Sequence, residues 1–395
     1  MANSRRMTAI AVALMTTVGF AAVGTQSSTA ATAASTETTT AAAPARELRI
    51  TRFLGEQRLP HKLRLSGTTV GGLSGIDRDP RTDTWYFISD DRWRYNPARF
   101  YTGRLAIDRA TGAFTGVNLT GVTTLRRQGG SAYPAYGRPR SADPETIRFD
   151  RWSRRLIWAQ EGDRPDEANP DIPVSDLFVR WTDRRGRHLG DLSMPGNLKM
   201  TATASGPRRN FGFEGLTTTE HSVVAVTEGP RHEDGPVPTA RRGAAARITV
   251  WSRDGRPRAQ YAYPIDPLPA APIPANGKSD SGVSEILAID DRRYLALERS
   301  WIEGVGYRAK LYEVDLGGAT NVLNRDSLVG GRPYRPVVKR LVSDLSTVRT
   351  PVQNLESLAW GPRLRTGECT LVVGADDNFD RREANQFLAF AARGC

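Results

Sequence analysis

A repeated short motif constrains the fold of this chain more than any other feature of its sequence. In each copy a polar residue, usually glutamate, opens one apolar segment and an acidic residue closes the next, as in GFEGL (212–216) and HSVVAVTEGP (221–230). The copies follow one another at intervals of 71, 69, 71 and 71 residues, and their central residues are Ser74, Glu145, Glu214, Glu285 and Glu356. A period this regular indicates a repeat architecture.

Each repeat reads as short strands separated by polar or glycine-containing turns, without helical periodicity. Four antiparallel strands per repeat, arranged in a ring, form a β-propeller. We therefore predict an all-β protein with five four-stranded blades. The fifth copy ends after three strands, and the strand-like segment 47–59 belongs to no copy, so this segment is expected to close the ring. Six blades are the alternative, if 126–141 or 318–350 holds a degenerate copy.

The N-terminal part of the chain differs from the repeats in composition. Arg5 and Arg6 precede an apolar run and then small residues, which predicts a secretory signal peptide over 1–30; export by the twin-arginine route is the less favoured alternative. The Ala/Thr-rich segment 31–46 reads as a disordered linker. The propeller is then expected over 47–395. No later segment is apolar for long enough to span a bilayer, so we expect a secreted protein without a membrane span.

The two cysteines suit an oxidising compartment. Cys369 begins the second strand of the last repeat, and Cys395 ends the strand that follows. These two ends are neighbours in an antiparallel pair, which predicts a disulfide between them. The alternative is a pair of free thiols.

The net charge of +12 comes from 55 basic residues, of which only five are lysines. They are scattered along the chain and form no tract with interleaved aromatic residues, which argues against a nucleic-acid partner. A small anionic substrate suits this charge better. We expect a monomer.

The repeated acids are expected to meet at one mouth of the central channel, because the start of the first strand of a blade lies beside the end of the second. Many carboxylates at close range must be protonated, paired with arginine or bound to cations. Hard oxygen ligands favour Ca²⁺, whereas the four histidines have no zinc-ligand spacing. The candidate metal ligands are Asp90, Asp91, Glu145, Glu161, Glu214, Glu285, Glu298, Glu356, Asp376 and Asp377.

Arginines follow the second acid of each repeat and could bind phosphate oxygens. These candidate substrate-binding residues are Arg92, Arg164, Arg231, Arg299 and Arg381. A glutamate free of metal would serve as general base, and the candidates are Glu214, Glu228, Glu285 and Glu356. Two structural interpretations remain open. The glutamates could accept hydrogen bonds from backbone amides of a neighbouring blade, and the arginines could simply pair with adjacent acids.

At these same positions the chain resembles the secreted bacterial phytase-like family known as "esterase-like activity of phytase". The matching segments include GLSGIDRDP (72–80), DPETIRFD (143–150), FGFEGLT (211–217), LALERSW (295–301), NLESLAWGP (354–362) and DDNF (376–379). The resemblance implies a phosphoric ester hydrolase of the phytase or phosphodiesterase kind. Two alternatives remain: a lactonase-like or carboxylic ester hydrolase, and a binding or scaffold propeller without catalysis.

Overall fold

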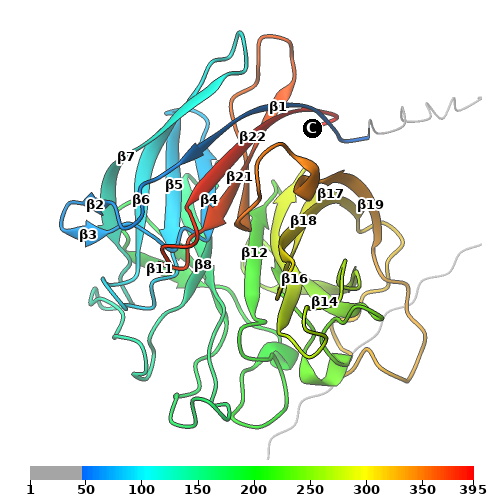
Figure 1. The fold of residues 1–395 in the computed structure, drawn as a ribbon. Coiled ribbons are helices and arrows are strands. Elements are labelled where there is room, and N and C mark those ends of the chain that lie inside the picture. Colours follow the sequence, from blue (N-terminus) through cyan, green and yellow to red (C-terminus); the bar gives the residue numbers. More distant parts are fainter. Residues whose placement is uncertain (1–46) are drawn as a thin grey trace, which may run out of the picture. The chain divides into compact units, whose positions relative to one another are not determined.

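The computed structural model describes residues 47–395, which form a ring of five four-stranded antiparallel sheets (Figure 1). The predicted five-bladed propeller is confirmed, and the six-bladed alternative is wrong. Segment 126–141 is a connection between two blades, and 318–350 holds a long loop, the last strand of the fourth blade (Val338–Asp344) and a short 3₁₀ turn. The predicted signal peptide (1–30) and linker (31–46) lie outside the described residues.

The blades follow the chain in order, four strands to a blade. The first blade holds β4 (Gly75–Asp79), β5 (Thr84–Ser89), β6 (Arg99–Ile107) and β7 (Phe114–Thr124). The second holds β8 (Pro144–Asp150), β9 (Arg155–Gln160), β10 (Phe178–Thr182) and β11 (His188–Asp191). The third holds β12 (Phe213–Thr218), β13 (Ser222–Thr227), β14 (Ala244–Ser252) and β15 (Pro257–Ile265). The fourth holds β16 (Ser279–Ala288), β17 (Arg293–Ile302), β18 (Gly306–Asp315) and β19 (Val338–Asp344).

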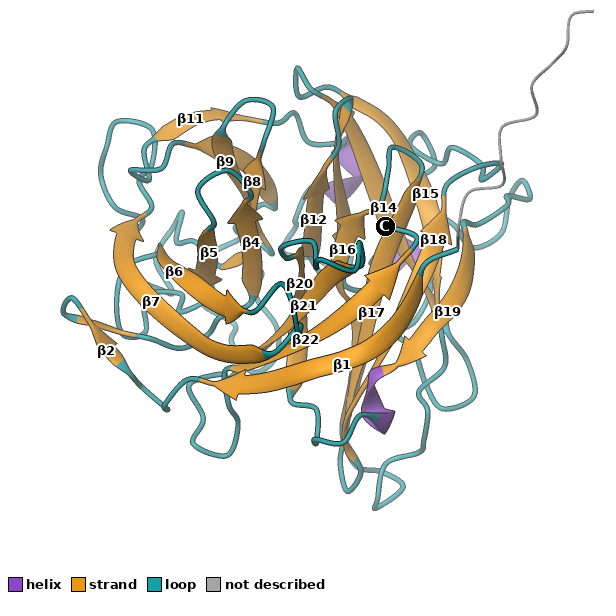
Figure 2. Ribbon diagram, turned by 90° about the horizontal axis from the view of Figure 1, so that it is seen from above, coloured by secondary structure: helices purple, strands orange, loops and turns teal. Residues whose placement is uncertain are grey.

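The fifth blade joins the two ends of the described chain. It contains β20 (Asn354–Trp360), β21 (Cys369–Asp376), β22 (Gln386–Arg393) and, as its fourth strand, β1 (Arg49–Arg58). Strand β1 runs antiparallel to β22 along the outside of the ring (Figure 2). The predicted closure by the N-terminal strand is therefore confirmed. This pairing gives the last blade its fourth strand and joins the two ends of the described chain within one sheet.

Smaller elements lie between the blades. A short hairpin of β2 (Arg64–Leu65) and β3 (Thr68–Thr69) precedes the first blade. Within residues 47–395 the only helical segments are three short 3₁₀ turns, at Gly196–Leu198, His232–Asp234 and Leu345–Thr347. None of the helices in this described part has the length and apolar character needed to cross a membrane.

The hydrophobic core lies between adjacent blades. One cluster combines Leu295 and Leu311 of the fourth blade with Leu371 and Leu388 of the fifth, all fully buried. Other clusters join the third blade to the fourth and the first to the fifth in the same way. Burial of apolar surface between neighbouring sheets therefore holds the ring together.

One arginine occupies the centre of the ring. Arg148 extends from β8, and its guanidinium donates to one backbone carbonyl in each of the other four blades. Nη1 lies 2.8 Å from the carbonyl oxygen of Ile76 and 2.6 Å from that of Leu358, Nη2 lies 3.1 Å from that of Ile286, and Nε donates to that of Leu216. The buried guanidinium of Arg148 therefore links its own blade to the other four at the axis of the ring.

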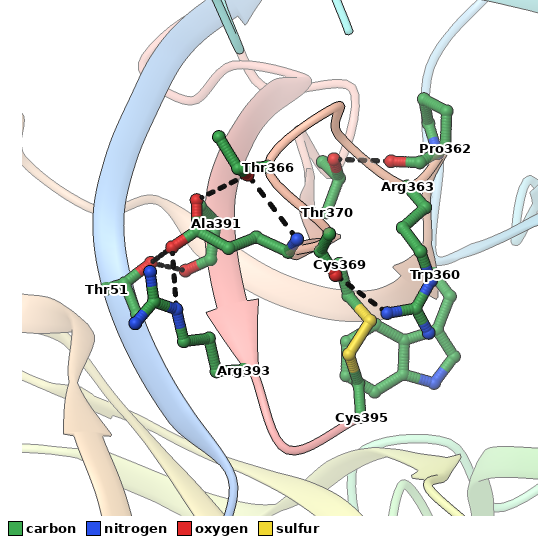
Figure 3. Close-up of a disulfide and its surroundings, with 12 residues drawn as sticks. Thr51, Trp360, Pro362, Arg363, Thr366, Cys369, Thr370, Ala391, Arg393 and Cys395 are labelled. Atoms are coloured by element: carbon green, nitrogen blue, oxygen red, sulfur yellow. Dashed lines mark hydrogen bonds and ion pairs between the residues drawn. A yellow bond between two sulfur atoms is a disulfide. The ribbon is translucent and has the colours of Figure 1, made fainter.

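A disulfide between Cys369 and Cys395 ties β21 to the segment after β22 (Figure 3). The same corner is held from the other side by β1, where Thr51 Oγ1 lies 3.2 Å from the carbonyl oxygen of Ala391 and 3.0 Å from Glu368 Oε1. The covalent bond therefore reinforces the blade that closes the ring.

Removing the disulfide is expected to lower the free energy of unfolding. For a crosslink between residues 26 apart, loop-closure entropy accounts for about 3 kcal/mol. Denaturant unfolding of Cys395→Ser, followed by tryptophan fluorescence, measures this loss. Wild-type protein in reductant should match the variant. Equal stability of the variant and the oxidised wild type would contradict a stabilising role for this bond.

Candidate functional site: an acidic cavity at the channel mouth

A bulge in the first strand of three blades turns a glutamate toward the channel mouth. The pairing between the first and second strands skips one residue in each of these blades: Glu145, Glu214 and Glu356. A bulge of this kind re-aims the side chain of the extra residue, and bulges are common beside functional sites. The three glutamates are buried, with 5 to 8% of their surface exposed. The same local geometry in three blades around one axis places three carboxylates together.

The other two blades carry serine at the bulge position. In the fourth blade the skipped residue is Ser284, one position before Glu285. Its hydroxyl donates to the carbonyl oxygen of Leu355 in the next blade, at 3.0 Å, and Ser74 in the first blade makes the corresponding contact with Pro144, at 3.4 Å. These serines link neighbouring blades. Aligning the fourth repeat on Glu285 is therefore wrong by one residue.

A second ring of side chains comes from the second strand of each blade. Each member follows the residue that pairs with the position just before the bulge. This ring contains Asp90, Glu161, Glu228, Arg299 and Asp376. The fourth blade thus supplies a cation where the other blades supply an acid. Glycines give these side chains room: a Cβ at Gly212 would lie 2.0 Å from the carbonyl oxygen of Glu161, and one at Gly282 would lie 2.4 Å from Cγ of Glu228.

The three bulge glutamates and four members of the second ring, all but Asp376, line a cavity of about 270 Å³. Its charged lining residues are seven acids and two arginines, namely Asp90, Glu145, Glu161, Glu214, Glu228, Asp280, Glu356, Arg92 and Arg299. The formal charge of this lining is −5 when all of these groups are ionised. The cavity therefore attracts cations and, left to itself, repels anions.

Burial and mutual repulsion raise the pKa values of these carboxyls. Burial, and then the neighbouring charge of Asp143, raises the pKa of Glu161 to about 8, although Arg92 opposes the shift. Burial is also the largest cause for Glu145 and Glu214, whose pKa values lie well above the usual range; the charges of Glu214 and Glu228, respectively, add to it. At neutral pH Glu161 therefore holds a proton unless another cation replaces it.

Two groups of three acids, in the cavity wall or directly beside it, could hold a metal ion. In each group one carboxylate oxygen per residue lies within 4.8 Å of the others: Asp143, Glu145 and Glu161 form one, and Glu161, Glu214 and Glu228 form the other. Within residues 47–395, no N–H or hydroxyl group donates to Glu214, although its side chain is buried. An all-carboxylate set with an unpartnered member fits a hard divalent cation such as Ca²⁺.

Each cavity arginine is held by acids. Nε and Nη2 of Arg92 lie 2.7 Å from the two oxygens of Asp143. Arg299 lies 2.9 Å from Glu228, 2.9 Å from Asp280 and 3.3 Å from Glu356. Neither guanidinium is therefore free to bind an anion unless the acids around it find other partners.

Other predicted ligands serve the scaffold. Glu285 lies 2.6 Å from Arg148 and accepts the backbone N–H of Leu216, at 2.9 Å, so it does what the structural interpretation of these glutamates predicted. Val283 lies opposite Glu298, whereas Glu285 lies opposite Leu297, so these two candidate ligands do not meet at the channel mouth. Glu298 instead contacts Lys339 and the hydroxyl of Tyr263 in the interface between blades.

Three predicted aspartates also lie behind the cavity lining. Asp91 pairs with the buried Arg99 at 2.5 Å. Asp377 accepts the backbone N–H of Gly72 at 2.9 Å and so links the fifth blade to the first. Burial, and then the neighbouring charge of Asp90, raises the pKa of Asp376 well above the usual range. These residues order the loops at the channel mouth.

The three remaining arginines lie away from the cavity. Arg164 donates to the backbone carbonyls of Thr203, Ser205 and Pro207. Arg231 pairs with Glu233 at 2.8 Å, and Arg381 is exposed. Of the five arginines predicted to bind substrate, only Arg92 and Arg299 line the cavity.

Sequence reasoning missed Asp143 and Asp280. Asp143 stands two residues before Glu145, and Asp280 stands two residues before Gly282 on an extended β16. Residues two apart on a strand lie on the same face. Asp280 also stands four residues before the bulge residue Ser284, so a search for acids two or four residues before the bulge positions would have found both.

Comparison with known proteins identifies the family. No curated protein matches the sequence. Solved structures with similar folds include an exo-β-1,3-galactanase from Phanerochaete chrysosporium, with a TM-score of 0.43 and 9% identity over 88% of this chain and 64% of that one. A GH43 β-1,3-galactosidase has a TM-score of 0.40 and 8% identity over 82% and 91% of the two chains. A protein of unknown function from Dyadobacter fermentans has a TM-score of 0.37 and 10% identity over 89% and 99%. The sequence pattern of the phytase-like family, described as "Esterase-like activity of phytase", matches residues 68–379, and this chain belongs to that family.

Proposed function

We propose that this protein is a secreted, calcium-dependent hydrolase of phosphate esters, with the acidic cavity as its active site. The observation that carries the proposal is the cavity lining, in which seven acids face two arginines. Such a site binds an anionic ester only after cations offset its charge. The N-terminal sequence and the disulfide support a location outside the cytoplasm, where Ca²⁺ is abundant enough for modest affinities to suffice.

The two groups of three acids would hold the cation. Asp143, Glu145 and Glu161 form one group, and Glu214 and Glu228 complete the other with Glu161. Bound Ca²⁺ would neutralise the carboxylates and polarise a phosphoryl oxygen. Once Glu228 and Asp143 have cation partners, Arg299 and Arg92 gain the freedom to bind the phosphate group of the substrate.

Glu356 is our candidate for the general base. It lines the cavity but belongs to neither group of three acids. Asn354 Nδ2 and Arg299 both contact Oε1, at 2.7 and 3.3 Å, which fixes the side chain and leaves Oε2 for a water molecule. Burial raises the pKa of Glu356, and a raised pKa suits a carboxylate that accepts a proton near neutral pH.

Two glutamine variants separate cation binding from proton transfer. Glu214→Gln should weaken Ca²⁺ binding, measured by calorimetry on EDTA-treated protein. Glu356→Gln should keep Ca²⁺ binding and lose roughly 100-fold or more in kcat on bis(p-nitrophenyl) phosphate, the usual contribution of a general base. The exposed Glu167→Gln is the matched control and should change neither quantity.

Wild-type protein that releases no product from bis(p-nitrophenyl) phosphate, p-nitrophenyl phosphate or phytate in millimolar calcium would contradict the proposed function. Turnover of a lactone or carboxylic ester under those conditions would favour the carboxylic ester hydrolase. Calcium binding without any turnover would favour a binding propeller.

A further inference from the structure

A second cavity, of about 530 Å³, adjoins the acidic cavity. Trp301 and Tyr307 line both cavities, so the two spaces meet at these rings. The walls come from the hairpin between β17 and β18, the segment before β20 and the loop after β21. We call this second cavity the aromatic groove. It lies between the fourth and fifth blades, at the same mouth of the channel as the acids.

The chemistry of the aromatic groove differs from that of the acidic cavity. Its walls combine the two aromatic rings with Val305, Pro351 and Val352. The remaining walls are polar and come from Ser346, Gln353, Glu383 and two arginines, of which Arg382 is paired with Asp380 at 2.5 Å. An aromatic group with few charges suits such walls, because the rings and apolar side chains can pack against it. A group with several negative charges would lose its hydration beside Glu383 without enough cations in return.

The two shared rings are placed differently. The hydroxyl of Tyr307 donates to Glu383 Oε1 at 2.9 Å, and Glu383 also accepts from Asn378 at 2.8 Å, which fixes the tyrosine ring. The half-buried Trp301 makes no side-chain hydrogen bond to any residue of the described chain. Its indole face and N–H are available to a ligand at the junction of the two cavities.

We propose that the aromatic groove binds the organic group of a phosphodiester, and that this group is planar and about the size of a nitrophenyl ring or a nucleobase. The proposal rests on the function proposed above, because the phosphate must sit in the acidic cavity for its ester group to reach Trp301. It also implies that a substrate carrying several phosphates, such as phytate, is a poor one, since the groove offers its additional charges only Arg308 as a cation without an acidic partner.

Two diesters with the same leaving group test the proposal. Bis(p-nitrophenyl) phosphate and methyl p-nitrophenyl phosphate both release p-nitrophenol, but only the first carries a second aromatic ring. Trp301→Ala should lower kcat/KM for the first by roughly 10- to 100-fold, as expected from the loss of one stacking contact, and should change that for the second much less. The exposed Trp152→Ala, in the hairpin between β8 and β9, is the control.

A binding measurement separates failure of the groove from failure of the proposed function. Stacked p-nitrophenyl phosphate should quench tryptophan fluorescence in the presence of calcium, and Trp301→Phe should remove that part of the quenching. Equal losses on the two diesters, or no loss on either, would overturn the groove proposal while leaving hydrolysis intact. Absence of turnover would overturn the proposed function; quenching by way of Trp301 would then still support the groove, and its absence would overturn both.

Discussion

Arg148→Met is expected to lower the free energy of unfolding by about 3 to 5 kcal/mol, the usual cost of removing one partner of a buried ion pair. Glu285 would then be left fully buried without its counter-charge. Four backbone carbonyls, one in each of the other blades, would lose a donor at the same time. Because the ring closes around this single group, we expect the loss to be among the largest that one substitution in this chain can produce.

Comparison of variants isolates the origin of that loss. Arg148→Met/Glu285→Gln removes the uncompensated charge and should recover part of the stability. Arg155→Met, at an exposed arginine at the start of β9, is the control and should stay within about 0.5 kcal/mol of wild type. Denaturant unfolding in EDTA, followed by tryptophan fluorescence, measures all of these variants. An Arg148→Met protein as stable as the control would show that the central guanidinium does not hold the blades together.

The sequence allowed the architecture to be predicted because the repeat period is independent of fine register. Five copies and one unpaired N-terminal segment sufficed to predict the blade count and the closing strand β1. Arg148 was beyond this reasoning. Its role depends on four carbonyl-bearing strands of the other blades meeting at one axis, and a lone arginine in RFD (148–150) gives no sign of that.

The candidate site was predicted less completely, for a reason that lies in the fourth blade. Usually the alternation of polar and apolar residues fixes a strand's register, because one face is buried and the other is solvated. From Ser281 to Leu287, however, β16 is buried on both faces, so the sequence SGVSEIL fits two registers equally well. We aligned the fourth repeat on its glutamate to match the other repeats. This alignment placed Glu285 at the bulge position that Ser284 occupies in the structure. For the same reason the sequence placed Glu298, and not Arg299, in the second ring of side chains.

The cation-free protein is expected to lose stability as the pH rises from about 5 to about 9. A carboxyl whose pKa is higher in the folded state than in the unfolded chain binds its proton more tightly when folded. Its stabilising contribution is therefore complete below the unfolded pKa and is lost as the pH rises through the folded pKa. For Glu161 this window runs from 4.5 to about 8, and at about 1.36 kcal/mol per pH unit the loss reaches at most about 5 kcal/mol.

Calcium should counteract this loss of stability at high pH. Cation binding to the carboxylates releases their protons, so the affinity rises with pH over the same window. A ligand at 100 times its dissociation constant stabilises the folded state by about 2.7 kcal/mol. Melting temperatures measured from pH 5 to 9 should therefore fall with pH in EDTA, and the gap between the EDTA and calcium curves should widen toward pH 9.

Glu161→Gln provides the sharpest form of this measurement. Glu161 belongs to both groups of three acids, so the variant should flatten the fall in EDTA and also reduce stabilisation by calcium. The exposed Glu167→Gln should leave both curves unchanged. Curves in EDTA and calcium that coincide at every pH would contradict a cation site in the cavity. A fall in EDTA that Glu161→Gln does not flatten would instead assign the proton-linked stability to other carboxyls of the ring.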